Sequence, residues 1–256
     1  MTERTHIDRV IDVAMLAGTL LIQSGSEIYR VEDTMIRIAH SQGIMDLNVL
    51  AMPAALFVSL EQTNLSRMKR ILSSSYNIEK VCDVNQISRQ LASGELNLEE
   101  AYQELQLLKE KPLPYKPLET LLAATVAAPF FTLMFGGNLA DAIGAIIATF
   151  WGFLLYIFME KNVKIPFVSA FSGAFCFTLI GFLWSRFSGF TTHMDWIMAG
   201  CVMPFVPGIA LTNAIRDLMT NHLNTGMSKL FESLLIIFAL GAGTTLAILI
   251  MNQLLS

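Results

Sequence analysis

Five stretches of this chain contain no charged side chain, and each is long enough, or nearly so, to cross a lipid bilayer as a helix. They cover residues 120–140, 142–159, 165–185, 196–215 and 233–256. Because a hydrocarbon core of roughly 30 Å needs about 20 helical residues, we expect a mainly α-helical membrane protein with a bundle of five transmembrane helices. Their expected positions are about 118–138, 140–160, 165–187, 195–215 and 231–254.

Charged side chains are concentrated in the first part of the 256-residue chain. Residues 1–119 carry 12 basic and 16 acidic side chains, whereas residues 120–256 carry 5 of each, so the net charge of −4 comes from the first part alone. The segment KPLPYKP between them holds three prolines and cannot form regular helix. The sequence therefore predicts an α+β domain exposed to water at 1–116 and a membrane domain at 117–256.

Composition also excludes several classes of protein. A pI near 5.6 without a basic cluster argues against nucleic-acid binding, which needs Lys and Arg to neutralise phosphates. Cys82, Cys176 and Cys201 lie far apart, with no CxxC pair and no histidine at ligand spacing. A disulfide framework, a metal site or another cofactor is therefore not expected. The charged start and its short apolar stretch do not resemble a signal peptide.

The positions of the basic residues predict the orientation in the membrane. If the five helices alternate, one side receives nearly all the basic residues that flank them: Lys116, Lys161, Lys164, Arg216 and Lys229. The other side receives only Arg186. Because basic residues favour the cytoplasmic side, we expect the N-terminal domain in the cytoplasm and the C-terminus outside.

The N-terminal domain reads as helices around a small β-structure. Apolar residues at spacings of three and four predict a helix over residues 7–41, with a break near Ser24–Gly25. The β-branched segment at 47–62 has a central proline and favours two short strands or one bent strand. Further helices are predicted at 66–76, at 85–92 and after a capping Asn97.

The fourth predicted transmembrane helix contains Pro204, Pro207 and Gly208 near its middle. Each proline removes an N–H group and disturbs the preceding turn, so we expect a break there. Broken helices build substrate sites in many secondary transporters, because a half-helix start offers N–H groups to anions. A proline kink that serves only packing is the alternative, and the sequence leaves both open.

Polar residues follow this break. Asn213 lies on the second half-helix, and Arg216 and Asp217 close it, either as an anchor at the membrane interface or as substrate contacts. Glu232 enters the fifth apolar stretch, where a carboxylate is costly unless it is paired or protonated. It could carry a proton or pair with Lys229. In the N-terminal domain, the segment QSGSEIYRVED is more typical of a structural ion network than of a hydrolytic site, because no nucleophile with a base is readable.

Two blocks together resemble the threonine/serine exporter family, specifically its N-terminal module. They are LLIQSGSEIYRVEDTMIRIA (20–39) and PGIALTNAIRDLMTNHLNTGMSKLFESLLI (207–236). The first carries a Ser-Gly-x-Glu-x-x-Arg-Val-Glu pattern, complete here as Ser24, Gly25, Glu27, Arg30, Val31 and Glu32. The second pattern is complete as Pro207, Gly208, Asn213, Arg216, Asp217, Gly226 and Glu232.

The resemblance implies a subunit of a secondary transporter in the bacterial cytoplasmic membrane, not an enzyme, that exports threonine and serine or a C4 dicarboxylate. Split members of this family pair such a module with a second, smaller multispan subunit, and a homo-oligomer is a further option. Pro207, Gly208, Asn213 and Arg216 would bind the carboxylate, and Glu232 or Asp217 would couple a proton. Two alternatives remain: a membrane-anchored enzyme or sensor active in the N-terminal domain, and a subunit that only supports its partner.

Overall fold

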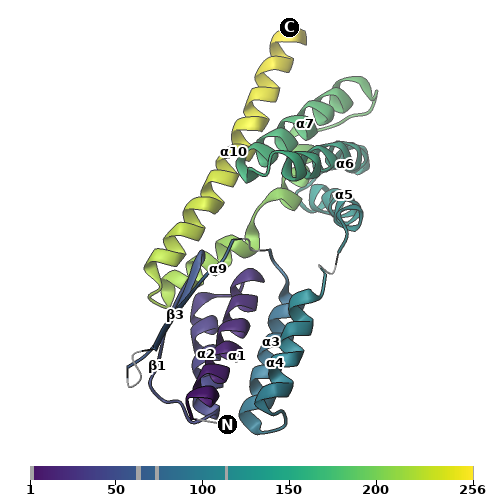
Figure 1. The fold of residues 1–256 in the computed structure, drawn as a ribbon. Helices are drawn as coiled ribbons and strands as arrows, with labels where there is room; N and C mark the ends of the chain where they lie inside the picture. Colours follow the sequence, from purple (N-terminus) through teal and green to yellow (C-terminus); the bar gives the residue numbers. More distant parts are fainter. Residues whose placement is uncertain (1–2, 62–64, 73–74, 113–114, 256) are drawn as a thin grey trace. The chain divides into compact units, whose positions relative to one another are not determined.

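The computed structural model describes residues 3–61, 65–72, 75–112 and 115–255, and its contacts divide the chain into two compact units (Figure 1). The N-terminal unit comprises Met1–Pro114 together with Ile209–Leu230, and the membrane unit comprises Tyr115–Gly208 together with Phe231–Ser256. A segment from the apolar part of the sequence thus groups with the N-terminal residues. The domain division between residues 116 and 117 stays a prediction.

The N-terminal unit is built from helices and one small sheet. Its elements are α1 (Glu3–Gln23), α2 (Ile28–Ser41), β1 (Leu47–Met52), β2 (Ala55–Leu60), β3 (Leu65–Arg70), α3 (Ile78–Ser93), α4 (Leu98–Glu110) and α9 (Gly208–Met219). Helices α1 and α2 lie between the sheet and the α3–α4 pair (Figure 1). This middle layer is the most buried part of the unit, with side chains such as Leu21, Ile28 and Met35 fully enclosed.

The predicted break near Ser24–Gly25 is confirmed. Helix α1 ends at Gln23 and α2 begins at Ile28, so residues 24–27 form the turn of a helical hairpin. Gly25 has a φ of +77°, and a Cβ built on it would lie 2.5 Å from the Tyr76 ring. Only glycine adopts a positive φ and tolerates so close a neighbour at little cost, which is why the chain turns here.

The sheet confirms one strand prediction and corrects another. Residues 47–60 form two antiparallel strands, in which Leu47 pairs with Leu60 and Met52 with Ala55. The helix predicted at 66–76 is wrong, because residues Leu65–Arg70 form β3 alongside β2. Apolar residues in this segment also fit a helical spacing, and pairing with β2 decides between the two.

The two following helices carry the expected start signals. Asn77 caps α3 by accepting a hydrogen bond from the Lys80 amide at 2.9 Å, so this helix starts seven residues before the predicted 85. Asn97 caps α4 as predicted, in a capping box with Glu100.

The membrane unit contains the long apolar helices. They are α5 (Pro117–Met134), α6 (Leu139–Asn162), α7 (Pro166–Phe187) and α10 (Leu223–Leu255), and the shorter α8 (Met194–Val202) continues into the 3-10 turn η1 (Met203–Phe205). In the part of the chain that the structure describes, four helices are long and apolar enough to cross a membrane, and five if α8–η1 and α9 are counted as one broken span. The protein is therefore a mainly helical membrane protein with four or five candidate spans.

The predicted break in the fourth span is confirmed. Val206 is extended, with ψ at 126°, as expected for a residue that precedes proline. Helix α9 then begins at Gly208, where the second half-helix was predicted to start.

Small residues bring the membrane helices close together. A Cβ on Gly243 would lie 2.4 Å from the Phe171 carbonyl oxygen, and one on Gly152 would lie 3.0 Å from that of Gly173. Gly241 differs, because a Cβ there would meet nothing within 4 Å. Gly152 and Gly243 therefore allow the helices to pack closely, and Gly241 does not contribute to this packing.

Candidate functional site

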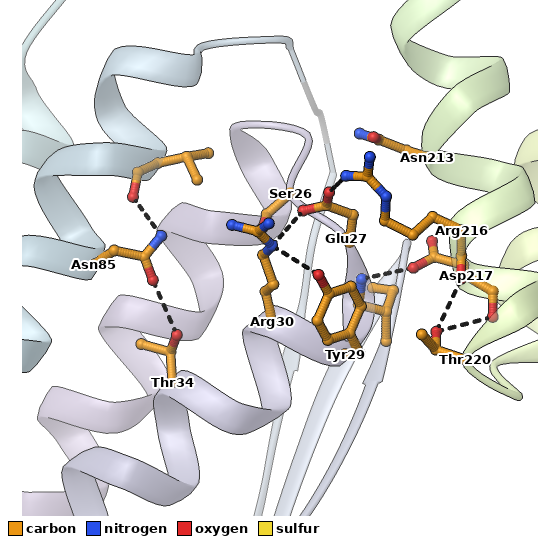
Figure 2. Close-up of polar contacts among 12 residues, drawn as sticks. Ser26, Glu27, Tyr29, Arg30, Thr34, Asn85, Asn213, Arg216, Asp217 and Thr220 are labelled. Atoms are coloured by element: carbon orange, nitrogen blue, oxygen red, sulfur yellow. Dashed lines mark hydrogen bonds and ion pairs between the residues drawn. The ribbon is translucent and has the colours of Figure 1, made fainter.

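The two sequence blocks that resemble the exporter family meet inside the N-terminal unit. Helix α9 and the first residues of α10 lie against the turn between α1 and α2 and the start of α2 (Figure 2). The contact joins residues that are 189 positions apart in the chain. Seven ionisable side chains form this contact, and we call them the interblock network: Glu27, Arg30, Glu32, Arg216, Asp217, His222 and Lys229.

Glu27 is the centre of one half of the network. Its carboxylate pairs with Arg216 through Oε1 and with Arg30 through Oε2, the second at 3.1 Å. The Glu27 side chain is 9% exposed, whereas those of Arg216 and Arg30 are 46% and 47% exposed. Two half-exposed guanidinium groups therefore converge on one buried carboxylate (Figure 2).

Arg30 is held in place by a second contact. Its Nε also donates to the Tyr29 hydroxyl at 3.0 Å. This hydrogen bond, aided by the Glu27 carboxylate and opposed by burial, raises the pKa of the Arg30 guanidinium above its ordinary value. Arg30 is thus a fixed positive charge at any physiological pH.

Asp217 anchors the other half of the network at the start of α2. Its carboxylate is fully buried, accepts a hydrogen bond from the Ile28 amide at 2.9 Å and pairs with Lys229 at 2.9 Å. The first amides of a helix lack partners inside the helix and carry its positive dipole end. Asp217 therefore caps α2 from a distant part of the sequence.

Glu32 connects the network to the sheet. Its Oε1 accepts the Ala51 amide of β1 at 3.0 Å, and its Oε2 lies 3.1 Å from His222 Nε2. His222 stands in the short connection between α9 and α10, and its Nδ1 lies 3.2 Å from the Thr220 hydroxyl. One side chain of α2 thus holds both the sheet and the α9–α10 connection.

Asn213 completes the contact. Its amide Nδ2 donates to the Gly25 carbonyl oxygen at 2.9 Å, so this residue of α9 fastens the turn between α1 and α2. The first motif and the second therefore recognise each other through a backbone carbonyl as well as through charges.

The structure separates the residues that were predicted as one substrate site. Asn213, Arg216 and Asp217 lie in the N-terminal unit, whereas Pro207, Gly208 and Glu232 group with the membrane unit. The Gly208 amide donates to the Val206 carbonyl oxygen at 2.8 Å, and Glu232 is exposed on α10. The roles of these six residues stay predictions.

The first motif was predicted as a structural ion network, and its Glu27–Arg30 pair is present. Sequence reasoning missed its partners on the second block. Lys229 was considered only beside Glu232, and His222 was not considered at all, although it is one of 4 histidines in the chain. The complementary charges of the two blocks were a signal that could have suggested their pairing.

Donors and acceptors are unevenly used in the interblock network. Each of its three carboxylates has both oxygens engaged: Glu27 by two arginines, Asp217 by Ile28 and Lys229, and Glu32 by Ala51 and His222. A guanidinium offers five N–H groups, and among the described residues Arg30 and Arg216 use only part of theirs. The guanidinium groups can therefore bind a further acceptor, such as an anion.

Comparisons with known proteins show which family the chain resembles. A family profile described as "Putative threonine/serine exporter" matches residues 12–251. The "Probable succinate transporter subunit YjjP" of Escherichia coli (strain K12) is 23% identical over 248 residues, which cover 94% of this chain and 94% of the relative. Its namesake in Klebsiella aerogenes is 22% identical over 229 residues, which cover 89% of this chain and 88% of the relative.

A longer relative matches as well. The "Threonine/serine exporter" of Corynebacterium glutamicum is 20% identical over 256 residues, which cover 97% of this chain but 52% of the relative. This chain thus spans about half the length of that exporter. No solved structure matches the chain.

The family is one of transporters, which implies a role without catalysis. The profile match covers nearly the whole chain and includes both motif blocks, and the protein therefore belongs to the threonine/serine exporter family.

Proposed function

We propose that this protein is one subunit of a secondary transporter that exports a small carboxylate metabolite across the bacterial cytoplasmic membrane. Family membership supports export, and the relatives named as transporter subunits support a second membrane subunit as partner. In this proposal the N-terminal unit faces the cytoplasm, because the basic residues flanking the helices favour that side, and the C-terminus lies outside.

The exposed guanidinium groups of the interblock network support our proposal for the substrate. Arg216 and Arg30 would receive the substrate carboxylate through the N–H groups that Glu27 leaves unused. Asn213, one turn before Arg216, would orient it. A carboxylate contact at Pro207 and Gly208 stays a separate prediction, as does proton coupling by Asp217 or Glu232.

The charges of the interblock network favour a dicarboxylate over threonine or serine as the substrate. An amino acid brings an ammonium group, which needs a carboxylate or carbonyl acceptor. Each of the three carboxylates already faces a basic side chain, which is Arg30 and Arg216, Lys229 or His222, so an incoming ammonium would meet a neighbouring basic group at each of them. A C4 dicarboxylate such as succinate brings only acceptors and matches the half-exposed guanidinium groups.

Counterflow in liposomes tests this function. Vesicles containing the chain and its partner subunit, loaded with unlabelled succinate, should accumulate labelled succinate, and labelled threonine should accumulate much less. Arg30→Gln and Arg216→Gln should each raise the KM for succinate. Arg37→Gln is the matched control on α2, because Arg37 forms only an exposed ion pair with Asp33. Equal transport in all three variants would contradict the site, and the absence of succinate counterflow would contradict the function.

Glu27→Gln separates an anion site from a purely structural network. The change removes the negative charge that two arginines share while keeping the shape of the side chain. If the arginines bind substrate, the free guanidinium groups should lower the KM for succinate even though folding stability falls. If Glu27 and its arginines only join α2 to α9, stability and transport should fall together.

A further inference from the structure

The three-stranded sheet of the N-terminal unit has a buried face and an outer face. Leu56, Val58 and Leu60 of β2 are at most 3% exposed and pack in the core with α1 and α2 (Figure 1). Because side chains alternate along a strand, the residues between them point to the outer face. Three residues from each strand lie there, and the strand register aligns them in three rows: Asn48, Ser59 and Ser66; Leu50, Phe57 and Met68; Met52, Ala55 and Arg70.

The middle row of the outer face is apolar. Leu50, Phe57 and Met68 stand directly opposite one another on the three strands, and they are 51%, 38% and 62% exposed. They line a shallow hollow of about 590 Å³, whose lining residues all belong to the strands. Adjoining large apolar side chains at a surface mark an interaction site more often than isolated ones do.

The two ends of the outer face carry opposite charges. Glu61 follows β2 directly, and its carboxylate accepts a hydrogen bond from Asn48 Nδ2 at 3.4 Å, so it lies where β1 begins. Arg70 lies at the other end, in register with Ala55. Both charged residues are exposed. The outer face is therefore acidic at one end, apolar in the middle and basic at the other end.

We propose that two copies of this chain pack their outer faces together around a twofold axis that runs across the strands. This axis reverses the strand direction, so Glu61 of each copy lies toward Arg70 of the other, and the apolar middle row packs on itself. A twofold axis along the strands would instead bring Glu61 toward Glu61 and Arg70 toward Arg70. Juxtaposed like charges oppose association, so the charges select the first arrangement.

A second copy fits this face better than the other ways to cover it. Pairing along the sheet edge would use β1 or β3, and the charged Arg67 and Lys69 on β3 oppose such pairing. An anionic lipid surface would attract Arg70 but repel Glu61. A second copy in the reversed orientation supplies an opposite charge to both ends and an apolar row to the middle.

The size of the face predicts how tightly the copies associate. Three strands of six residues cover roughly 300 Å² at standard strand spacing, whereas a stable soluble complex buries about 800 Å² per partner. Membrane helices hold both copies in one bilayer, which raises their effective concentration. We therefore expect a dimer in the membrane that dissociates in dilute detergent. This inference does not depend on the transported substrate.

Thiol cross-linking of the full chain in native membranes tests the contact. In a variant without the 3 native cysteines, Phe57→Cys and Leu50→Cys should each yield a dimer with a short cross-linker, because facing sheets lie roughly 10 Å apart. Leu107→Cys is the matched control, since Leu107 is an apolar residue of α4 that is 69% exposed. A dimer yield from Phe57→Cys no higher than from Leu107→Cys would overturn the proposal, as would cross-links of Phe57→Cys to a different protein.

Charge reversal tests the orientation, with the Phe57→Cys dimer yield as the readout. Glu61→Arg and Arg70→Glu should each lower the yield several-fold, because each places like charges at both ends of the contact. When the two variants are expressed together with different tags, the mixed dimer should return to the wild-type yield. This recovery also shows that both variants are folded. Unchanged yields in the single variants, or no recovery in the mixture, would overturn the reversed packing.

Discussion

Replacement of Asp217 by alanine should destabilise the N-terminal unit more than any exposed change on α2 or α9. The carboxylate is fully buried and satisfies two groups from different segments, the Ile28 amide and the Lys229 ammonium. Alanine removes both contacts at once. It leaves Lys229, which is only 16% exposed, without this carboxylate, and it leaves the Ile28 amide at the start of α2 without this acceptor.

The expected cost follows from the environment of the pair. Breaking a buried ion pair by removing one partner costs about 3–5 kcal/mol. Lys229 keeps some access to water and a 3.4 Å contact with the Ser26 carbonyl oxygen, so we expect the lower end, about 3 kcal/mol. At roughly 2–4 °C per kcal/mol, the melting temperature of the purified chain should fall by roughly 6–12 °C. Hydrogen exchange at the Ile28 amide should accelerate in parallel.

Two further variants decide whether the reasoning is right. Asp217→Ala combined with Lys229→Met should be less destabilised than the sum of the single variants, because the second change removes the charge that Asp217 had compensated. Asp33→Ala is the matched control, since its pair with Arg37 is exposed and is worth at most about 1 kcal/mol. If Asp217→Ala costs no more than Asp33→Ala, or if the double variant is strictly additive, Asp217 does not anchor α2.

Three other changes probe separate parts of the structure. Gly226→Ala should lower folding stability by about 1–3 kcal/mol, because its Cβ would lie 2.9 Å from the Ala214 carbonyl oxygen. Gly241→Ala in the same helix should raise folding stability by about 0.5–1 kcal/mol. Thermal melts of the two variants measure both effects. Asn97→Ala removes the capping box of α4 and should lower stability by about 1 kcal/mol, with faster hydrogen exchange in its first turn. Exposed Cys82 should react with a membrane-impermeant maleimide in inverted membrane vesicles but not in intact cells, and the reverse pattern would contradict the proposed cytoplasmic side.

Local signals in the sequence predicted local structure well. The helical hairpin could be predicted because Gly25 marks a turn that needs a positive φ. The start of α9 could be predicted because proline disrupts the turn before it, and Asn97 was recognisable as a cap because glutamates follow it. Each of these signals acts within a few residues, where propensity and hydrogen bonding decide the conformation.

The failures share a physical cause, which is long-range contact. Residues Leu65–Arg70 form a strand because β2 supplies a hydrogen-bonding edge, and nothing within the segment announces that neighbour. Asp217 was expected either to anchor a helix end at the membrane interface or to contact substrate, and its hydrogen bond with Ile28, 189 residues earlier, was not predicted. A single sequence does not reveal which of its distant charges will pair.

The interblock network shows why a structural and a functional reading of the two motifs are not exclusive. A purely structural ion cluster would be expected to use its donors as fully as its acceptors, since unpaired charge adds no stability. Here each carboxylate oxygen has a partner, while N–H groups of Arg30 and Arg216 that pair with none of the described residues remain at a half-exposed surface. Glu27, which joins α2 to α9, carries one negative charge and therefore does not neutralise both arginines. This arrangement suits a protein that binds an anion briefly and then releases it. The buried ion pairs fix the site before binding, and the half-exposed guanidinium groups contact the anion.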